Sequence, residues 1–223
     1  MFTYLANVFK PRPLVFTRHR SSCIVRSPPK TAPRESPTPL VFVSAKNWDV
    51  ESDKGMTVIS SLLSEKGFTC LQNDLALPDP QTRADSSAML KWFESELRST
   101  IRLSTIPFPP VIFARASGCL IGQTYVSSNP ATGLVLISPP RNNAELQGIM
   151  GHDKLPILQS QLSEFNFEPH FPIAVIAKPG QMKTLEEFNR LVRAPEVDKI
   201  TVDDLEGQRA LDGIHNWLDQ LGV

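Results

Sequence analysis

The sequence lacks the features that define several classes of protein. Its 223 residues contain no run of about 18 apolar residues, which excludes a membrane-spanning helix. Three cysteines (Cys23, Cys70 and Cys119) are too few and too scattered for a disulfide scaffold or a structural zinc site. The glycine-rich motifs that bind nucleotide phosphates and dinucleotides are also absent. With 41% apolar and 21% charged residues, the chain has the composition of a globular protein, and we expect neither a metal nor a cofactor.

Acidic residues are missing from the N-terminal stretch. Residues 1–34 hold seven of the 23 Lys and Arg residues and no Asp or Glu. The remainder, residues 35–223, therefore holds sixteen basic residues and all 23 acidic ones, a formal charge of −7. This acidic body argues against a nucleic acid or an anionic membrane as its ligand, and it favours a basic protein partner.

The N-terminal stretch has the composition of a mitochondrial transit peptide, rich in Arg and hydroxyls and free of acid. Pro11 and Pro13 divide its apolar residues, whereas a secretory signal needs one apolar run of about 7–15 residues. A basic tail that binds phosphate, or nothing, is the alternative. Several prolines up to Pro39 then form an extended spacer. We predict a transit peptide and spacer over residues 1–38, a domain over residues 39–223, and a location in the mitochondrial matrix.

Strand-like and helical patterns alternate along the predicted domain. Continuous apolar runs predict buried strands at 40–43, 68–71, 111–114, 133–138, 172–177 and 199–202. Apolar residues three and four positions apart predict helices at 53–66, 86–103, 118–127, 185–192 and 208–221. Strands that alternate with helices are joined by right-handed crossovers in a parallel sheet. The predicted fold class is therefore α/β, a mainly parallel sheet of about six strands with helices on both faces.

The segment 110–139 carries a strand, a tight turn, a helix and a second strand. Its residues Gly118, Leu120-Ile121, Gln123, Asn129-Pro130 and 133–139 resemble the α/β-hydrolase superfamily. In that family a strand enters a G-x-S-x-G turn, which presents the nucleophilic serine at the start of a helix. The resemblance extends over residues 39–223, and it implies a minimal esterase- or lipase-like fold with little or no cap.

The turn departs from the family pattern. Aligned on these residues, it reads Ala114-Arg115-Ala116-Ser117-Gly118, so the nucleophile position holds Ala116, which has no hydroxyl. Shifting the alignment by one residue makes Ser117 the nucleophile. It then places Arg115 and Cys119 where the strained turn needs small residues. We favour the first alignment.

The expected acid and base are missing as well. The acid should follow the strand 172–177, but Lys178–Leu185 contains no carboxylate. The base should follow the last strand, where Gln208 stands, and glutamine cannot act as a general base. The resemblance therefore implies a pseudoenzyme without a catalytic triad.

Other residues keep alternative functions open. His152, within the region where active hydrolases insert a cap, is either a solvated loop residue or a displaced base for Ser117. Cys119 at a helix N-terminus is a candidate for a lowered thiol pKa.

The candidate ligand-binding residues are Ser44 and Ala45, in the loop expected to form the oxyanion hole, with Arg115 and Ser117 at the turn. Arg115 would bind an anionic ligand or a partner's carboxylate, or form a salt bridge to an acid such as Asp74.

Three functions follow. The first is a non-catalytic binding or assembly factor with a protein partner in mitochondria. The second is an active serine esterase or thioesterase that uses Ser117. The third is a module that binds a small molecule without turnover.

Overall fold

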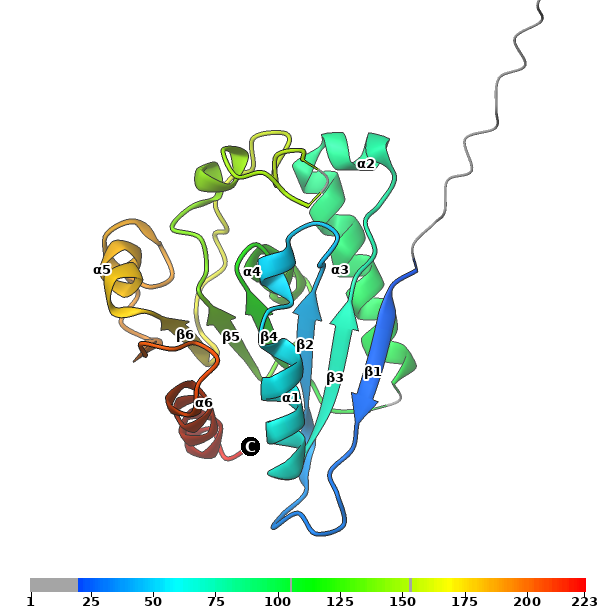
Figure 1. Cartoon of the computed structure of the whole chain (residues 1–223), viewed down its shortest axis with the longest axis vertical. Coiled ribbons are helices and arrows are strands. Elements are labelled where there is room, and N and C mark those ends of the chain that lie inside the picture. Colours follow the sequence, from blue (N-terminus) through cyan, green and yellow to red (C-terminus); the bar gives the residue numbers. More distant parts are fainter. Residues whose placement is uncertain (1–19, 105, 153) are drawn as a thin grey trace, which may run out of the picture.

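The computed structural model describes residues 20–104, 106–152 and 154–223. Within them, seven strands form one sheet in the order β1-β3-β2-β4-β5-β6-β7 (Figure 1). The strands are β1 (Ser22–Arg26), β2 (Ser36–Ser44), β3 (Phe68–Asp74), β4 (Val111–Arg115), β5 (Gly133–Ile137), β6 (Ile173–Ala177) and β7 (Val197–Thr201). All pairs are parallel except β1 with β3. The predicted α/β class and all six predicted strands are confirmed.

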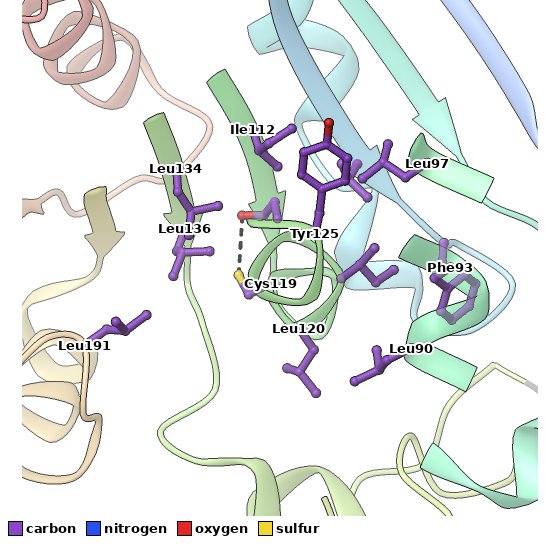
Figure 2. Packing of buried hydrophobic residues seen from close by; sticks show 14 of the residues in the cluster. Leu90, Phe93, Leu97, Ile112, Cys119, Leu120, Tyr125, Leu134, Leu136 and Leu191 are labelled. Atoms are coloured by element: carbon purple, nitrogen blue, oxygen red, sulfur yellow. Dashed lines mark hydrogen bonds between the residues drawn. The ribbon is translucent and has the colours of Figure 1, made fainter. Parts of the chain in front are cut away.

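Helices cover both faces of the sheet. They are α1 (Met56–Glu65), α2 (Pro80–Ala84), α3 (Ser86–Leu103), α4 (Gly118–Val126), α5 (Pro179–Phe188) and α6 (Gln208–Gln220), with 3-10 turns η1 (Val50–Ser52) and η2 (Asn143–Gln147). Leu40 and Phe42 of β2 pack with α1 and α6, whereas Val41 and Val43 pack with α3, α4 and α5. Figure 2 shows part of the second core, where Phe93 and Leu97 of α3 lie among residues of α4, β4 and β5. No helix of the described residues is long and apolar enough to span a membrane.

One strand lies inside the stretch predicted to be leader and spacer. Strand β1 pairs with β3 from Ser22 opposite Asp74 to Arg26 opposite Cys70, and β2 already begins at Ser36. The folded unit therefore begins upstream of residue 39, since these backbone hydrogen bonds belong to the sheet. The first nineteen residues of the predicted transit peptide lie outside the described residues.

Helix α5 begins six residues before its predicted start. Pro179 opens the helix, because a proline in the first turn loses no intrahelical hydrogen bond. The Asn189 side chain ends it by accepting hydrogen bonds from the N–H groups of Leu191 and Val192. The predicted helix 185–192 was therefore wrong in position.

The parallel strands direct their carboxyl ends to one edge of the sheet (Figure 1). Helix α4 lies close to this sheet because it carries glycine at position 122. A Cβ atom added there would lie 3.2 Å from Ala114 Cβ and 3.3 Å from Leu134 Cδ1. The turn between β4 and α4 is thereby held firmly at the carboxyl edge, where open α/β sheets bind their ligands.

Candidate functional site

The turn between β4 and α4 has the backbone of a nucleophile elbow. Ala116 lies at its apex with a φ of +49°, a left-handed conformation that non-glycine residues rarely adopt. Its N–H donates to the Ile137 carbonyl at 3.0 Å, which ties the turn to β5. Such a strand–turn–helix corner exposes its central side chain at the top of the sheet. Here that side chain is a methyl group.

Ser117 is bound by a carboxylate from a distant loop. Its Oγ and its backbone N–H both donate to Asp49 Oδ2, the N–H at 3.2 Å. Asp49 follows β2, and its Oδ1 accepts the N–H of Glu51 at 3.0 Å at the start of η1. In a nucleophile elbow, the N–H after the apex stabilises the oxyanion of the reaction. In this chain the Asp49 side chain already accepts a hydrogen bond from that donor.

The loop expected to complete an oxyanion hole is closed by internal hydrogen bonds. Ser44 Oγ donates to the Asn73 carbonyl at 3.1 Å, and the Ala45 N–H donates to Ser52 Oγ at 3.0 Å. Both residues are buried. The candidate ligand-binding roles of Ser44 and Ala45 are therefore wrong, because their polar groups bind within the fold.

Arg115 points away from the site and into the protein. Its side chain, only 5% exposed, donates to the Lys54 carbonyl at 2.9 Å and lies 3.1 Å from Glu206 Oε1. The predicted partner Asp74 instead lies 2.9 Å from Lys46 Nζ, and this hydrogen bond and charge raise the pKa of Lys46. Arg115 therefore anchors the turn before α1 and the loop before α6, and it is a structural cation rather than a ligand-binding one.

Amide side chains stand where an acid and a base would be expected. Gln181 of α5 accepts from Ser138 Oγ at 2.9 Å and donates to the Pro139 carbonyl at 3.2 Å. Gln208 is exposed in the first turn of α6 and donates to Asp212 at 2.7 Å. Neither amide can accept the proton of a nucleophile at neutral pH.

The structure does not bring His152 to Ser117. The His152 side chain is exposed, and the backbone N–H of this residue donates to the Trp48 carbonyl at 3.1 Å. Among the described residues that line the cavity at the elbow, none is a histidine. A histidine base for Ser117 is therefore missing from the cavity lining in this part of the chain.

The thiol at the start of α4 is inert. Cys119 is buried within the cluster of Figure 2, where its Sγ lies 3.4 Å from the Ala114 carbonyl. Burial raises its pKa, so the predicted lowering was wrong. The core residue Cys70 likewise has a pKa raised by burial to about 12.

A cavity of about 340 Å³ lies over the elbow. Its polar floor and flank include Asp49, Ser117, Ser138, Gln181 and Thr184. Its apolar wall is formed by Pro139, Pro140, Leu146, Ile149, Ile157 and Leu185. The charged side chains of Glu51, Arg141 and Glu145 complete the lining, as does the methyl group of Ala116. The described residues contain no cluster of His, Cys, Asp or Glu arranged to hold a metal ion.

Sequence reasoning missed Asp49, the residue that decides the chemistry of the site. Asp49 and Ser117 are 68 positions apart, and no motif links them. The available signal was the position of Asp49 in the loop after a strand that neighbours β4, because the carboxyl ends of adjacent parallel strands meet.

Comparison with known proteins identifies the architecture. No protein family profile and no curated protein sequence matches the chain. Among solved structures, a carboxylesterase of the thaumarchaeon Nitrososphaera gargenis is similar, with a TM-score of 0.62, 10% identity and coverage of 91% of this chain and 95% of that one.

Two further solved structures are similar over nearly the same share of this chain. An alpha/beta superfamily hydrolase of Oenococcus oeni has a TM-score of 0.57 and 15% identity, over 92% of this chain and 97% of that one. An esterase of Thermogutta terrifontis has a TM-score of 0.58 and 10% identity, over 91% of this chain and 94% of that one. Together with the sheet order and the elbow, these neighbours show that the chain has the α/β-hydrolase fold.

Proposed function

We propose that this protein is a non-catalytic member of its fold class that works as a binding or assembly factor in mitochondria. One observation carries the proposal: the apex of the elbow is Ala116, and the amide that would stabilise an oxyanion is bound to Asp49. A serine hydrolase needs a nucleophile and a free oxyanion donor at this place. With neither, the cavity serves binding rather than turnover.

The mitochondrial location rests on the composition of the N-terminal stretch. Upstream of β1, residues 1–21 hold four basic residues and no acidic one, a composition that matches an import signal. A fusion of the full chain to a fluorescent protein should reach the mitochondrial matrix. A variant with Lys10, Arg12, Arg18 and Arg20 changed to glutamine should remain in the cytosol, and equal import of both forms would contradict this part of the proposal.

Labelling with a fluorophosphonate probe tests the absence of catalysis. The full chain should stay unlabelled, as should Ser117→Ala and Cys119→Ala, because no residue near the elbow is an activated nucleophile. Labelling of the native chain that disappears in Ser117→Ala would make this protein a serine hydrolase. A circular dichroism spectrum and a cooperative melting transition would establish that each sample is folded.

The cavity supports a second candidate, a module that binds a small molecule without turnover. Its volume of about 340 Å³ lies in the range of small-molecule sites, and its wall is largely apolar. A saturable rise of the melting temperature with a metabolite, lost in Leu185→Ser, would favour this function over the binding of a protein.

A further inference from the structure

The polar groups of the cavity differ in kind from those of a hydrolase site, because their donors are already used within the protein. The Ser117 N–H and hydroxyl both bind Asp49. The Ser138 hydroxyl donates to Gln181 at 2.9 Å, and the Thr184 hydroxyl donates to the Gly180 carbonyl at 3.3 Å. An ester carbonyl or a carboxylate entering this cavity would find few free donors.

Carboxylates outnumber cations in the lining of the cavity. Asp49, Glu51 and Glu145 line the cavity, against a single guanidinium, that of Arg141. The Arg141 Nε lies 3.8 Å from Glu145, and its backbone N–H donates to the same carboxylate at 2.9 Å. A carboxylate offers about four acceptor sites. The site is therefore suited to a ligand that donates hydrogen bonds and carries positive charge.

Two of these carboxylates carry that preference. Glu51 faces two cations, Lys54 at 3.6 Å and Arg115 at 4.0 Å, whereas Glu145 faces one, Arg141 at 3.8 Å. The hydrogen bonds that Asp49 accepts come from neutral groups, the Glu51 N–H and the N–H and hydroxyl of Ser117. Asp49 and Glu145 are thus the acceptors that an incoming cation would meet.

Apolar side chains line part of the cavity, and the residues next to them in the chain include exposed apolar ones. The hairpin closed by the Met150–Pro156 bridge places Ile149 and Ile157 in the wall. The same hairpin leaves Met150 66% exposed. Val50, next to Asp49 in the chain, is 56% exposed. Exposed apolar side chains that adjoin a cavity in this way are of the kind that marks protein interaction sites.

From these observations we propose that the cavity binds a lysine side chain presented by an apolar segment of a protein partner. A lysine combines an apolar stem, which fits the wall, with an ammonium that donates three hydrogen bonds to the acceptors of the floor. The described part of the chain begins at residue 20, and residues 20–223 hold 20 Lys and Arg against 23 Asp and Glu, a formal charge of −3 that favours the approach of such a basic segment. The inference rests on the proposed binding function and specifies the partner's chemistry.

Selection from three matched peptide libraries tests it on the full chain. Each library has nine-residue peptides with randomised flanks and a central lysine, methionine or glutamate. We expect the lysine library to yield peptides rich in Leu, Phe or Met that bind at least tenfold more tightly than their methionine-centred counterparts. The glutamate library should yield none. Equal binding of lysine and methionine peptides, a preference for glutamate, or no enrichment in any library would overturn the proposal.

Variants locate the binding on the molecule. Ile149→Ser, at a half-exposed wall position, should weaken the selected peptide about tenfold, and Glu145→Gln about three- to tenfold. Val58→Ser and Glu65→Gln, exposed on α1, are the matched controls and should leave the affinity unchanged. Binding that is insensitive to both cavity variants would overturn the assignment.

Two further outcomes separate the alternatives. n-Hexylamine that binds as tightly as the peptides would overturn the protein-partner assignment in favour of a small amine. Fluorophosphonate labelling decides the absence of catalysis independently of the peptide selection, so the two proposals can fail separately.

Discussion

The two side chains that flank Ala116 show what the elbow does in this protein. Arg115 and Ser117 each bind a carboxylate from a loop far away in the sequence, Glu206 and Asp49 respectively. The Arg115 pair lies outside the cavity, whereas the Ser117 pair forms part of its floor. Both pairs hold loops to the sheet, but only the second uses a group that catalysis would need. The turn that exposes a nucleophile in active hydrolases thus holds two distant loops against the sheet in this protein.

Breaking the Arg115 pair should have the largest effect. Glu206→Ala removes the nearer of the two carboxylates that face the buried Arg115 guanidinium, and we expect the free energy of unfolding to fall by about 3 kcal/mol. Arg115→Met removes the charge and keeps an apolar stem, while Glu206 stays partly solvated, so we expect a loss of about 1 kcal/mol. Urea denaturation of the two variants measures both values. A larger loss in Arg115→Met than in Glu206→Ala would contradict the structural role given to this pair.

Breaking the Ser117 pair should cost less. Asp49→Ala leaves the Ser117 N–H unpaired and removes the cap of η1, for an expected loss of about 2 kcal/mol. Asp85→Ala removes only the N-cap of α3 and is the matched control, with an expected loss of about 1 kcal/mol. Thermal and urea unfolding would compare them, and equal losses would mean that Asp49 is merely a helix cap.

The thiol beneath the elbow gives a pH-dependent test of how tightly this corner is packed. Unfolded cysteine ionises near its ordinary pKa of 9.0, whereas burial raises the pKa of Cys119 in the folded state. The stabilisation is therefore complete below pH 9 and is lost as pH rises towards the folded pKa. Between pH 9 and 10 we expect the thiol to account for a loss of about 1 kcal/mol. Urea titrations should show a shallower decline in Cys119→Ala, and identical pH profiles would indicate a solvated thiol.

Restoring the hydroxyl at the apex should have the smallest effect. Ala116→Ser supplies a nucleophile's oxygen, but the neighbouring amide stays bound to Asp49 and no cavity-lining residue is a histidine within the described part of the chain. We expect no fluorophosphonate labelling above the native level. Strong labelling would contradict this expectation and show that the site lacks only a serine at position 116 to be reactive.

The sequence predicts the elements that apolar patterning controls. The fully buried strand 40–43 and the amphipathic helix 86–103 appear where their periodicity places them, because burial on two faces or on one stripe leaves a clear signal. Strand β1 escapes this reasoning because all its residues are at least partly exposed and it lies next to a proline-rich stretch. Its place in the sheet depends on backbone pairing with β3, and the pattern of apolar side chains carries no information about that pairing.

The candidate site was predicted only in part. Ala116 and Gln208 could be located from the resemblance, since both lie in short motifs next to predicted strands. The partners of Arg115 and Ser117 could not, because Glu206 and Asp49 come from loops whose positions depend on the assembled sheet. The roles expected of Ser44 and Ala45 failed for the same reason: Asn73 and Ser52 bind their polar groups after folding.

Hydrolysis of p-nitrophenyl butyrate tests the central claim most directly, that this hydrolase fold carries no catalytic serine. The rate should be measured for the full native chain and for Ser117→Ala at equal, folded concentrations between pH 6 and 9. We predict the same background rate for both proteins across this range. Saturable turnover by the native chain that is lost in Ser117→Ala would contradict the account and make the protein an esterase.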